Sequence, residues 1–402
     1  MSEYVEYLHR EHDPESILCN TERFGAEIAE RSRKFHKSFP GYAPTPLANL
    51  QDLAEDLGVT SVWVKDESQR FGLNAFKGLG GSYCIGRYIA ERLGTDISEL
   101  SYERITSDEV RKRIGQITFV TATDGNHGRG IAWTAKLLGQ KSVVYMPHGS
   151  SAERLGNIKA LGADASITDM NYDDTVRFAE QQAEKNGWVL VQDTSWEGYE
   201  KIPSWIMEGY TTMGAEIREQ LNGQRPTHIF LQAGVGAMSG AMTGFFADLY
   251  KGSEKPIITI VEPNKADCIY KTAKADDGRL HAVTGSMNTI MAGLACGEPC
   301  SVGWEMLRDY ADNFVSMPDF VAAKGMRILG CPTGSDPRVI SGESGAAAFG
   351  LFAETMQSRS LEGLRRQLKL DGDSRVLCIS TEGDTDKANY RRIVWDGLYP
   401  SF

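Results

Sequence analysis

The sequence predicts an α/β protein in which strands and helices alternate in two successive sets. Short runs of β-branched and aromatic residues, such as 61–65 and 229–232, recur along most of the chain. The segments between them carry apolar residues at helical spacing, and several of these segments end at a glycine. Strands that alternate with helices in this way indicate parallel sheets covered by helices.

The first set of elements lies before residue 194. Pro44 and Pro46 force an extended path at its start. Strands are expected at 61–65, 117–120, 142–146, 165–167 and 188–193. Helices are expected at 50–57, 78–93, 99–113, 131–135, 152–161 and 172–185.

The second set follows a long connecting segment. Residues 193–203 are aromatic and charged and contain a glycine, so we expect an ordered loop that crosses between domains. A helix is expected from Ile206 to Leu221. Strands are then expected at 229–232, 257–262 and 376–380.

The composition is that of an ordinary globular protein. The chain has 402 residues, of which 41% are hydrophobic and 24% charged, enough for two or three domains with a sizeable core. A net charge of −11 argues against nucleic acid or an anionic membrane surface as a partner. The first residues are too charged for a signal peptide, and no apolar run reaches membrane-spanning length. We therefore expect a cytoplasmic protein.

The cysteines and histidines do not predict a metal site. The seven cysteines are odd in number and scattered, unlike a secreted disulfide framework. Cys296 and Cys300 are too few for a closed zinc site, and the seven histidines form no H-E-x-x-H cluster. We expect no metal, while a local disulfide or a redox role for one cysteine pair stays open.

A lysine stands at the junction between the first long strand and a helix. Lys77 follows Phe76 and precedes Gly78, Gly80 and Gly81. Desolvation and the positive end of a helix both disfavour an ammonium, so a neutral nucleophilic amine can form there. The glycines let the backbone approach a ligand closely. The alternative is an ordinary surface lysine at a helix start.

A glycine-rich loop follows the predicted strand 229–232. Its sequence, 232–241, places Gly234, Gly236 and Gly240 at the start of a helix. Backbone N–H groups at such a helix start bind anions, most naturally a phosphate. A dinucleotide-binding turn is the competing interpretation, but its fingerprint G-x-G-x-x-G is one residue shorter than the spacing here. A structural turn without ligand is the other alternative.

Two further strand ends carry polar groups. The turn 123–128 begins a helix and can hold a carboxylate, but Asp124 within it would repel an anion. Asp124 is better explained by an ammonium partner or by proton transfer, with helix capping as the alternative. Ser380 ends the strand 376–380, where a hydroxyl can donate or accept a hydrogen bond without carrying charge. That hydroxyl could equally satisfy a backbone group.

These segments, in this order, resemble the fold-type II pyridoxal-phosphate enzymes, which include threonine and serine dehydratases, cysteine synthase, threonine synthase and tryptophan synthase β. The resemblance runs from about Pro44 to Asp386. It implies two open, twisted, mostly parallel sheets flanked by helices, and pyridoxal 5′-phosphate as the cofactor. The matching segments are 74–77, 124–128, 234–238, Ser380 and, as a further cofactor-side segment, 341–345.

The resemblance also implies roles for individual residues. Lys77, beside Phe76, would form the Schiff base with the cofactor. The substrate carboxylate would be bound by the loop of Thr123, Asp124, Gly125, Asn126 and His127, and Asn126 would also contact the phenolic oxygen of the cofactor. The phosphate would be held by Gly234, Val235, Gly236, Ala237 and Met238. Ser380 would contact the pyridine nitrogen, with Thr381 and Thr385 left open as alternatives.

Two departures from the usual family pattern narrow the function. Asp124 replaces the usual hydroxyl residue before G-N-H-G, and the aromatic segment 193–210 is unlike the dehydratases. Both features resemble the ammonia-lyases that act on diaminopropionate. That resemblance implies elimination of ammonia from D- and L-2,3-diaminopropionate, giving pyruvate and two ammonia molecules.

The expected chemistry assigns a base to each face of the substrate. Lys77, as a neutral amine, is expected to take the α-proton of the L-isomer, and Asp124 that of the D-isomer. Asp193 is expected as a second acid near the β-amine of the substrate. A carboxylate also selects a cationic β-ammonium over the neutral hydroxyl of serine or threonine.

The sequence leaves other functions open and also predicts a domain division and an oligomeric state. The chain could instead be a serine/threonine dehydratase or racemase of the same family, or an inactive relative that binds an amino acid. Residues 1–82 and 200–402 are expected to form a large cofactor-binding domain, and 83–199 a small domain. The family implies a homodimer with a small-molecule amino-acid substrate, and we expect no nucleic-acid or membrane partner.

Overall fold

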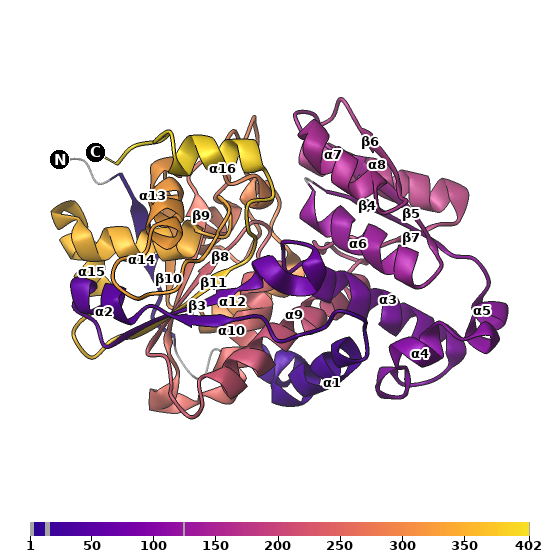
Figure 1. Ribbon diagram of the computed structural model, residues 1–402, viewed down its shortest axis with the longest axis horizontal. Coiled ribbons are helices and arrows are strands. Elements are labelled where there is room, and N and C mark those ends of the chain that lie inside the picture. Colours follow the sequence, from indigo (N-terminus) through magenta and orange to yellow (C-terminus); the bar gives the residue numbers. More distant parts are fainter. Residues whose placement is uncertain (1–3, 13–16, 124, 402) are drawn as a thin grey trace.

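The computed structural model describes residues 4–12, 17–123 and 125–401 (Figure 1). Its larger sheet has seven strands in the order β1-β10-β9-β8-β11-β3-β2. The five central strands are parallel, and β1 and β2 are antiparallel strands at the two edges. The strands are β1 (Glu6–His9), β2 (Leu47–Asn49), β3 (Ser61–Asp66), β8 (His228–Gln232), β9 (Ile257–Pro263), β10 (Asn313–Met317) and β11 (Arg375–Ser380).

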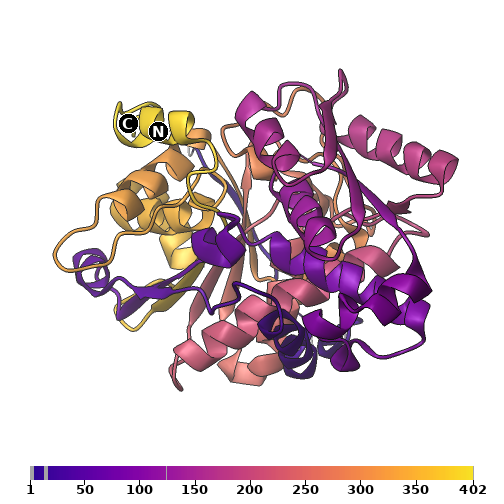
Figure 2. The same cartoon turned by 45° about the vertical axis from the view of Figure 1, so that its right-hand side comes forward.

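The smaller sheet has four parallel strands in the order β6-β5-β4-β7. All of its strands come from one continuous part of the chain, which forms its own layer in both views (Figure 1, Figure 2). The strands are β4 (Thr118–Ala122), β5 (Lys141–Met146), β6 (Asp164–Ile167) and β7 (Val189–Leu190). The α/β class and the two mostly parallel sheets predicted from the sequence are therefore confirmed.

Helices cover both faces of the larger sheet because its strands are apolar on both sides. Along β3, Val62 and Val64 face one hydrophobic core, while Trp63 between them faces another. Such a run, apolar on both faces, is the pattern of a buried parallel strand. One core is covered by α1 (Ala26–Lys37), α3 (Gly78–Leu93), α9 (Lys201–Gln220), α10 (Ala237–Leu249), α11 (Cys268–Ala275) and α12 (Ser301–Tyr310). The other is covered by α2 (Gln51–Leu57), α13 (Asp319–Gly330), α14 (Ala347–Gln357), α15 (Glu362–Gln367) and α16 (Lys387–Val394).

The smaller sheet is covered in the same way. Val120 and Val143 pack with α8 on one face, and Val144 and Met146 pack with α6 and α7 on the other. These helices are α6 (Asn126–Leu137), α7 (Ala152–Lys159) and α8 (Tyr172–Asn186). The short helices α4 (Tyr102–Ile105) and α5 (Asp108–Ile114) lead from α3 to β4.

Several predicted boundaries were wrong, each for a local reason. The single helix expected at 99–113 is broken because Ser101 and Ser107 each cap a new helix start with their side-chain oxygens. The strand expected at 188–193 ends at Leu190, where the Tyr199 hydroxyl bonds to the Leu190 carbonyl and receives the Gln192 N–H. The loop expected to reach Pro203 ends earlier, since α9 begins at Lys201 and a proline is tolerated in a first helical turn.

The strands β1, β2 and β10 were not predicted. Both edge strands are short, β1 with four residues and β2 with three, so they carry little periodic signal. The proposed division at residues 82 and 200 stays a prediction, because sheet membership alone does not fix where one domain ends. Among the helices of the described residues, none has the length and apolarity needed to span a membrane.

The carboxyl ends of the central strands position the site. In open α/β sheets, ligands bind in the crevice just beyond these ends. Here β8 and β11 lead directly into the glycine-rich loop and the polar turn at 381–385, and β4 leads into the loop before α6. The segments singled out in the sequence therefore leave their strands on the same side of the fold.

Candidate active site

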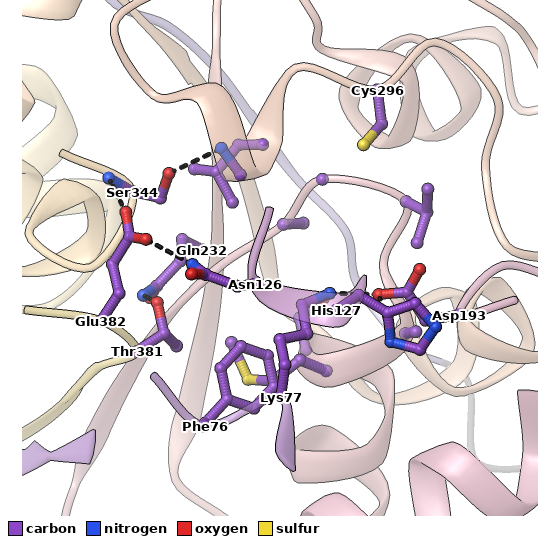
Figure 3. A pocket seen from close by; sticks show the side chains of 18 of the residues that line it. Phe76, Lys77, Asn126, His127, Asp193, Gln232, Cys296, Ser344, Thr381 and Glu382 are labelled. Carbon is purple, nitrogen blue, oxygen red and sulfur yellow. Dashed lines mark hydrogen bonds and ion pairs between the residues drawn. The ribbon is translucent and has the colours of Figure 1, made fainter. Parts of the chain in front are cut away.

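A cavity lies where the carboxyl ends of the two sheets meet (Figure 3). Strands β8 and β11 of the larger sheet and β4 and β7 of the smaller one all end at its wall. Residues from eight separate segments thus come together at one place. They include Phe76, Lys77, Thr123, Asn126, His127, Asp193, the loop 232–239, Thr381 and Glu382.

Lys77 is the N-cap residue of α3, and its side chain enters the cavity. Close glycine packing fixes this helix start, since a Cβ atom at Gly130 of α6 would lie 3.1 Å from the Gly78 Cα. The side chain is 21% exposed, and its Nζ forms an ion pair with the Asp193 carboxylate. The predicted lysine therefore lines the same cavity as the glycine-rich loop, with its amine paired to Asp193.

Asp193 lies just beyond β7 and is almost completely buried, with 4% of its surface exposed. Burial alone would raise the pKa of this carboxyl, but His127 and the Lys77 ammonium outweigh it and hold the pKa below the usual value. Asp193 is thus an ionised acid in contact with the amine of Lys77. A group of this kind can hold or return a proton beside the reacting amine.

His127 lies behind Asp193 and has one tautomer dictated by its neighbours. Its Nε2 is 2.8 Å from the Val191 carbonyl oxygen, which can only accept, so Nε2 carries the hydrogen. Its Nδ1 is 3.7 Å from Asp193 Oδ2 and has no hydrogen-bond partner among the described residues. Burial lowers the pKa of His127, against the opposing effect of Asp193. The imidazole is therefore held by Val191 and packs behind Asp193.

The loop before α6 combines a tight turn with a helix start. The Thr123 hydroxyl accepts the Gly125 N–H at 2.9 Å, and Gly125 has a φ of +157°, which favours glycine. Asn126 then begins α6, and its Nδ2 donates to Glu382 Oε2 at 2.6 Å. No side chain of the described residues caps this helix start, which suits a carboxylate ligand. Asp124 lies outside the described residues, so its predicted role stays a prediction.

The glycine-rich loop forms a second helix start at the opposite wall. Gly236 is the N-cap of α10 with a φ of +94°, and no side chain among the described residues caps this helix. The first N–H groups of α10 therefore face the cavity through Ala237, Met238 and Ser239. There is no room for a side chain at Gly240, where a Cβ atom would lie 2.7 Å from the Gly303 carbonyl oxygen.

Thr381 and Gln232 form a polar pair at the ends of β11 and β8. Gln232 Nε2 donates to the Ile379 carbonyl and to Thr381 Oγ1, both at 2.9 Å. Thr381 therefore accepts this bond, and its own hydrogen remains to be donated elsewhere. Ser380 instead donates to Ser341 Oγ at 2.7 Å and does not line the cavity. Its contact with the pyridine nitrogen stays a prediction, and Thr381 is better placed.

The sequence did not identify several residues at the cavity wall. Gln232 and Glu382 adjoin the recognised segments, but only the fold shows that they face the cavity. Tyr172 at the start of α8 and Cys296 in the loop before α12 come from parts of the chain without any recognisable motif. Gln232 is the last residue of β8, and Glu382 lies two residues beyond β11. A search of each predicted strand end and the two residues after it would have included both.

The donor set suits a phosphorylated pyridine aldehyde. The uncapped start of α10 offers N–H groups to a phosphate, and Lys77 offers an amine to an aldehyde. The buried Gln232 Oε1 has no hydrogen-bond partner among the described residues, although it belongs to the cavity wall. A buried acceptor left without a partner points to a polar ligand at this wall.

Comparisons with known proteins agree with this chemistry. Residues 38–382 match the family model described as "Pyridoxal-phosphate dependent enzyme". The chain is 53% identical to the diaminopropionate ammonia-lyase of Salmonella typhimurium, over 90% of this chain and 91% of that protein. It is 52% identical to that of Escherichia coli strain K12, over 94% of this chain and 93% of that protein.

A solved structure is similar over nearly the whole length. The crystal structure of the Escherichia coli diaminopropionate ammonia-lyase in complex with D-serine has a TM-score of 0.90 and 48% identity, covering 98% of each chain. This chain therefore belongs to the pyridoxal-phosphate-dependent enzyme family, of fold type II. Its cofactor is pyridoxal phosphate, as the resemblance in the sequence implied.

Proposed function

We infer that this chain is an ammonia-lyase that acts on 2,3-diaminopropionate. With one water, each substrate molecule gives pyruvate and two molecules of ammonia. Support comes from relatives that carry this activity in their names and are aligned over nine-tenths of the chain. The observation that carries the proposal is the ion pair between Lys77 and the buried Asp193 at the glycine-rich cavity.

We propose that this cavity holds the cofactor by its phosphate, aldehyde and ring. The N–H groups of 234–238 would hold the phosphate, Lys77 would bind the aldehyde, and Phe76 and Asn126 would lie beside the ring. A hydroxyl at the end of β11 would face the ring nitrogen, with Ser380 as the sequence-based candidate and Thr381 better placed by its free hydrogen. The bound cofactor supplies a conjugated electron sink for the carbanion formed at Cα.

Proton transfer is assigned to the charged wall of the cavity. Lys77, as a neutral amine, would remove the Cα proton of the L-isomer, and Asp193 would hold the amine in place. The Asp193 carboxylate would also attract the β-ammonium of the substrate, which serine and threonine lack. For the D-isomer, Asp124 is the proposed base, and this role rests on the sequence alone.

The loop before α6 is the proposed site for the substrate carboxylate. Thr123 closes the turn through its hydroxyl, Gly125 allows the tight backbone, and Asn126 presents the helix start. His127 has its side chain turned to Val191 and Asp193, so we assign it a supporting role rather than direct carboxylate contact.

The function is tested by an absorbance spectrum of the purified protein and its titration with each isomer of 2,3-diaminopropionate. We expect the visible band of the bound cofactor, a change of that band with either isomer, and two ammonia molecules per pyruvate. D-serine and L-threonine serve as comparison substrates. Faster pyruvate release from D-serine, or faster 2-oxobutyrate release from L-threonine, would indicate a dehydratase, and an absence of any ammonia would indicate an inactive relative.

We further propose that the protein works in the cytoplasm as a homodimer, with 83–199 as a small domain. The family resemblance supports the homodimer. Light scattering on a sizing column tests the dimer, for which we expect about twice the mass of the single 44.3 kDa chain. A single-chain mass at micromolar concentration would contradict it.

A further inference from the structure

Glu382 connects the cofactor-side segments that the sequence singled out separately. It lies two residues beyond β11 and is 2% exposed. Its backbone forms an antiparallel bridge to Ala75, two residues before Lys77, and its carbonyl accepts the Gly342 N–H at 2.9 Å. One residue thus contacts both the lysine segment and the segment 341–345.

The side chain of Glu382 makes the connection to the smaller sheet. Its Oε2 accepts the Asn126 Nδ2–H at 2.6 Å, and Asn126 is the first residue of α6 (Figure 3). The bond therefore joins the end of β11 in the seven-stranded sheet to the helix that follows β4 in the four-stranded sheet. A hydrogen bond to a carboxylate is shorter and roughly twice as strong as a neutral one.

The carboxylate of Glu382 is itself held in one orientation. Its other oxygen, Oε1, accepts the Ser344 N–H at 3.2 Å, and the Thr385 hydroxyl donates to Oε2 at 3.3 Å. Gly342 leaves the space that this carboxylate occupies, because a Cβ atom at Gly342 would lie 3.1 Å from Glu382 Oε1. Both carboxylate oxygens are therefore used as acceptors.

A second buried acid, Glu343, directly precedes Ser344. Burial, followed by the charge of Glu382, raises the pKa of Glu343 to about 7. Glu382 accepts hydrogen bonds from Asn126, Ser344 and Thr385, so its side-chain oxygens are occupied as acceptors.

The hydrogen bond to Glu382 fixes the orientation of the Asn126 amide. A free asparagine amide can rotate so that either its oxygen or its nitrogen faces a neighbour. A carboxylate can only accept, so Nδ2 must face Glu382, and the remaining N–H and the Oδ1 atom are then fixed in direction. Asn126 lines the cavity with these groups.

We propose that Glu382 is a positioning residue, whose carboxylate fixes the Asn126 amide against the end of β11 so that one geometry is presented to cofactor and substrate. The proposal rests on the assignment of Asn126 to the cofactor and substrate site. It explains why a buried acid stands at the wall of a cavity that binds a phosphorylated, anionic cofactor. Its oxygens accept hydrogen bonds from Asn126, Ser344 and Thr385 rather than facing the ligand alone.

The test is a double-mutant cycle of Glu382→Gln and Asn126→Ala in the cofactor-loaded enzyme. Glutamine keeps the size of the side chain but places an NH2 group against the donors that Glu382 now accepts. We expect each single change to weaken cofactor retention and to lower kcat about tenfold. If Glu382 acts through Asn126, the double variant loses no more than about twofold beyond the larger single loss.

A matched control separates positioning from general stability. Glu262 is also a buried glutamate that accepts two backbone N–H groups, from Ile269 at 2.9 Å and Tyr270 at 2.6 Å, and it does not line the cavity. Glu262→Gln should lower the Tm while leaving cofactor retention and kcat within about twofold. Independent, multiplying losses for Glu382→Gln and Asn126→Ala would overturn the proposal.

A second measurement needs no substitution at Glu382. In protein labelled with 15N-asparagine, the Asn126 side-chain signal is identified by its loss in Asn126→Ala. We expect one of its two Nδ2 protons to be shifted downfield and protected from exchange, both with and without cofactor. Two fast-exchanging protons at ordinary positions would contradict the bond to Glu382. Wild-type turnover of diaminopropionate is measured separately, so a failure of the proposed function is distinguishable from a failure of this inference.

Discussion

The two sheets contribute different chemistry to the cavity. The seven-stranded sheet contributes the loop 232–239 and Thr381, which offer backbone N–H groups, an amide and a hydroxyl. The four-stranded sheet contributes the Asp193 carboxylate, with His127 behind it. The first wall is suited to holding a ligand in place, because backbone groups and uncharged side chains keep their state as pH changes. The second wall is suited to moving protons.

Lys77 and Glu382 each contact a residue on the wall opposite their own strand. Lys77 follows β3 of the larger sheet, but its amine is paired with Asp193 at the other wall. Glu382 follows β11 and binds Asn126 at the start of α6. The larger sheet therefore reaches the smaller one through two charged side chains. The comparison leads to four expectations, from the largest effect to the smallest.

Substitution of Lys77 should have the largest effect on turnover, because its amine is expected both to bind the cofactor and to transfer the substrate proton. Lys77→Ala is expected to remove the visible absorbance band of the bound cofactor and to lower turnover by at least about a thousandfold. Lys201→Ala, at an exposed lysine of α9 outside the cavity, is the control and should keep both. A Lys77→Ala protein with the normal band and activity would refute the assignment.

Loss of charge at Asp193 should affect the proton-transferring wall alone. Asp193→Asn keeps the shape of the side chain but removes the partner of the Lys77 ammonium, so we expect kcat for L-diaminopropionate to fall about a hundredfold or more. The cofactor should stay bound, because its phosphate site lies at the other wall. Spectra and steady-state rates measure this difference. A protein that loses the cofactor at the same rate as it loses activity would show that the two walls are not separate.

Substitution of Asp124 should change the rates for the two isomers of diaminopropionate unequally. If it is the base for the D-isomer, Asp124→Asn should lower kcat for D-diaminopropionate about a hundredfold and that for the L-isomer by about threefold or less. Rates with each pure isomer measure the ratio. Equal losses with both isomers would contradict a separate base for each face of the substrate.

The proton on Glu343 should affect the free energy of unfolding rather than the catalytic rate. Its pKa of about 7 in the folded protein lies above its usual value of 4.5, so the folded state binds this proton more tightly than the unfolded chain. The stability from this proton is fully present below the usual pKa and is lost as pH rises through about 7. At roughly 1.4 kcal/mol per pKa unit, the loss is at most about 3.5 kcal/mol.

Denaturant unfolding at pH 5 and pH 8 measures this effect. Glu343→Gln should remove this part of the decline in unfolding free energy with rising pH, while Glu362→Gln, at an exposed glutamate, should leave it unchanged. An identical pH dependence in the wild-type protein and in Glu343→Gln would show that Glu343 does not keep its proton near neutrality.

Local sequence patterns were enough to predict the wall formed by backbone groups. The glycines of 234–240 form one short motif, and Phe76 and Lys77 form another. Each motif lies at a junction between a strand and a helix. The parallel sheets follow from the same alternation. The predicted cofactor required the resemblance as well, since a single glycine loop does not select one phosphate ligand.

The contacts between the walls could not be predicted, because they join residues far apart in the chain. Asn126 and Glu382 are separated by 256 positions, and Lys77 and Asp193 by 116. The position of the strand-end hydroxyl was also undetermined. Successive residues of a strand face opposite ways, so an uncertainty of one residue decides between Ser380 and Thr381.

The most direct test of the account is to reduce the cofactor-loaded protein with borohydride and locate the modified lysine by peptide mass spectrometry. The account predicts a phosphopyridoxyl group on Lys77 and on no other lysine. Modification at a different lysine, with Lys77 recovered unmodified, would contradict it.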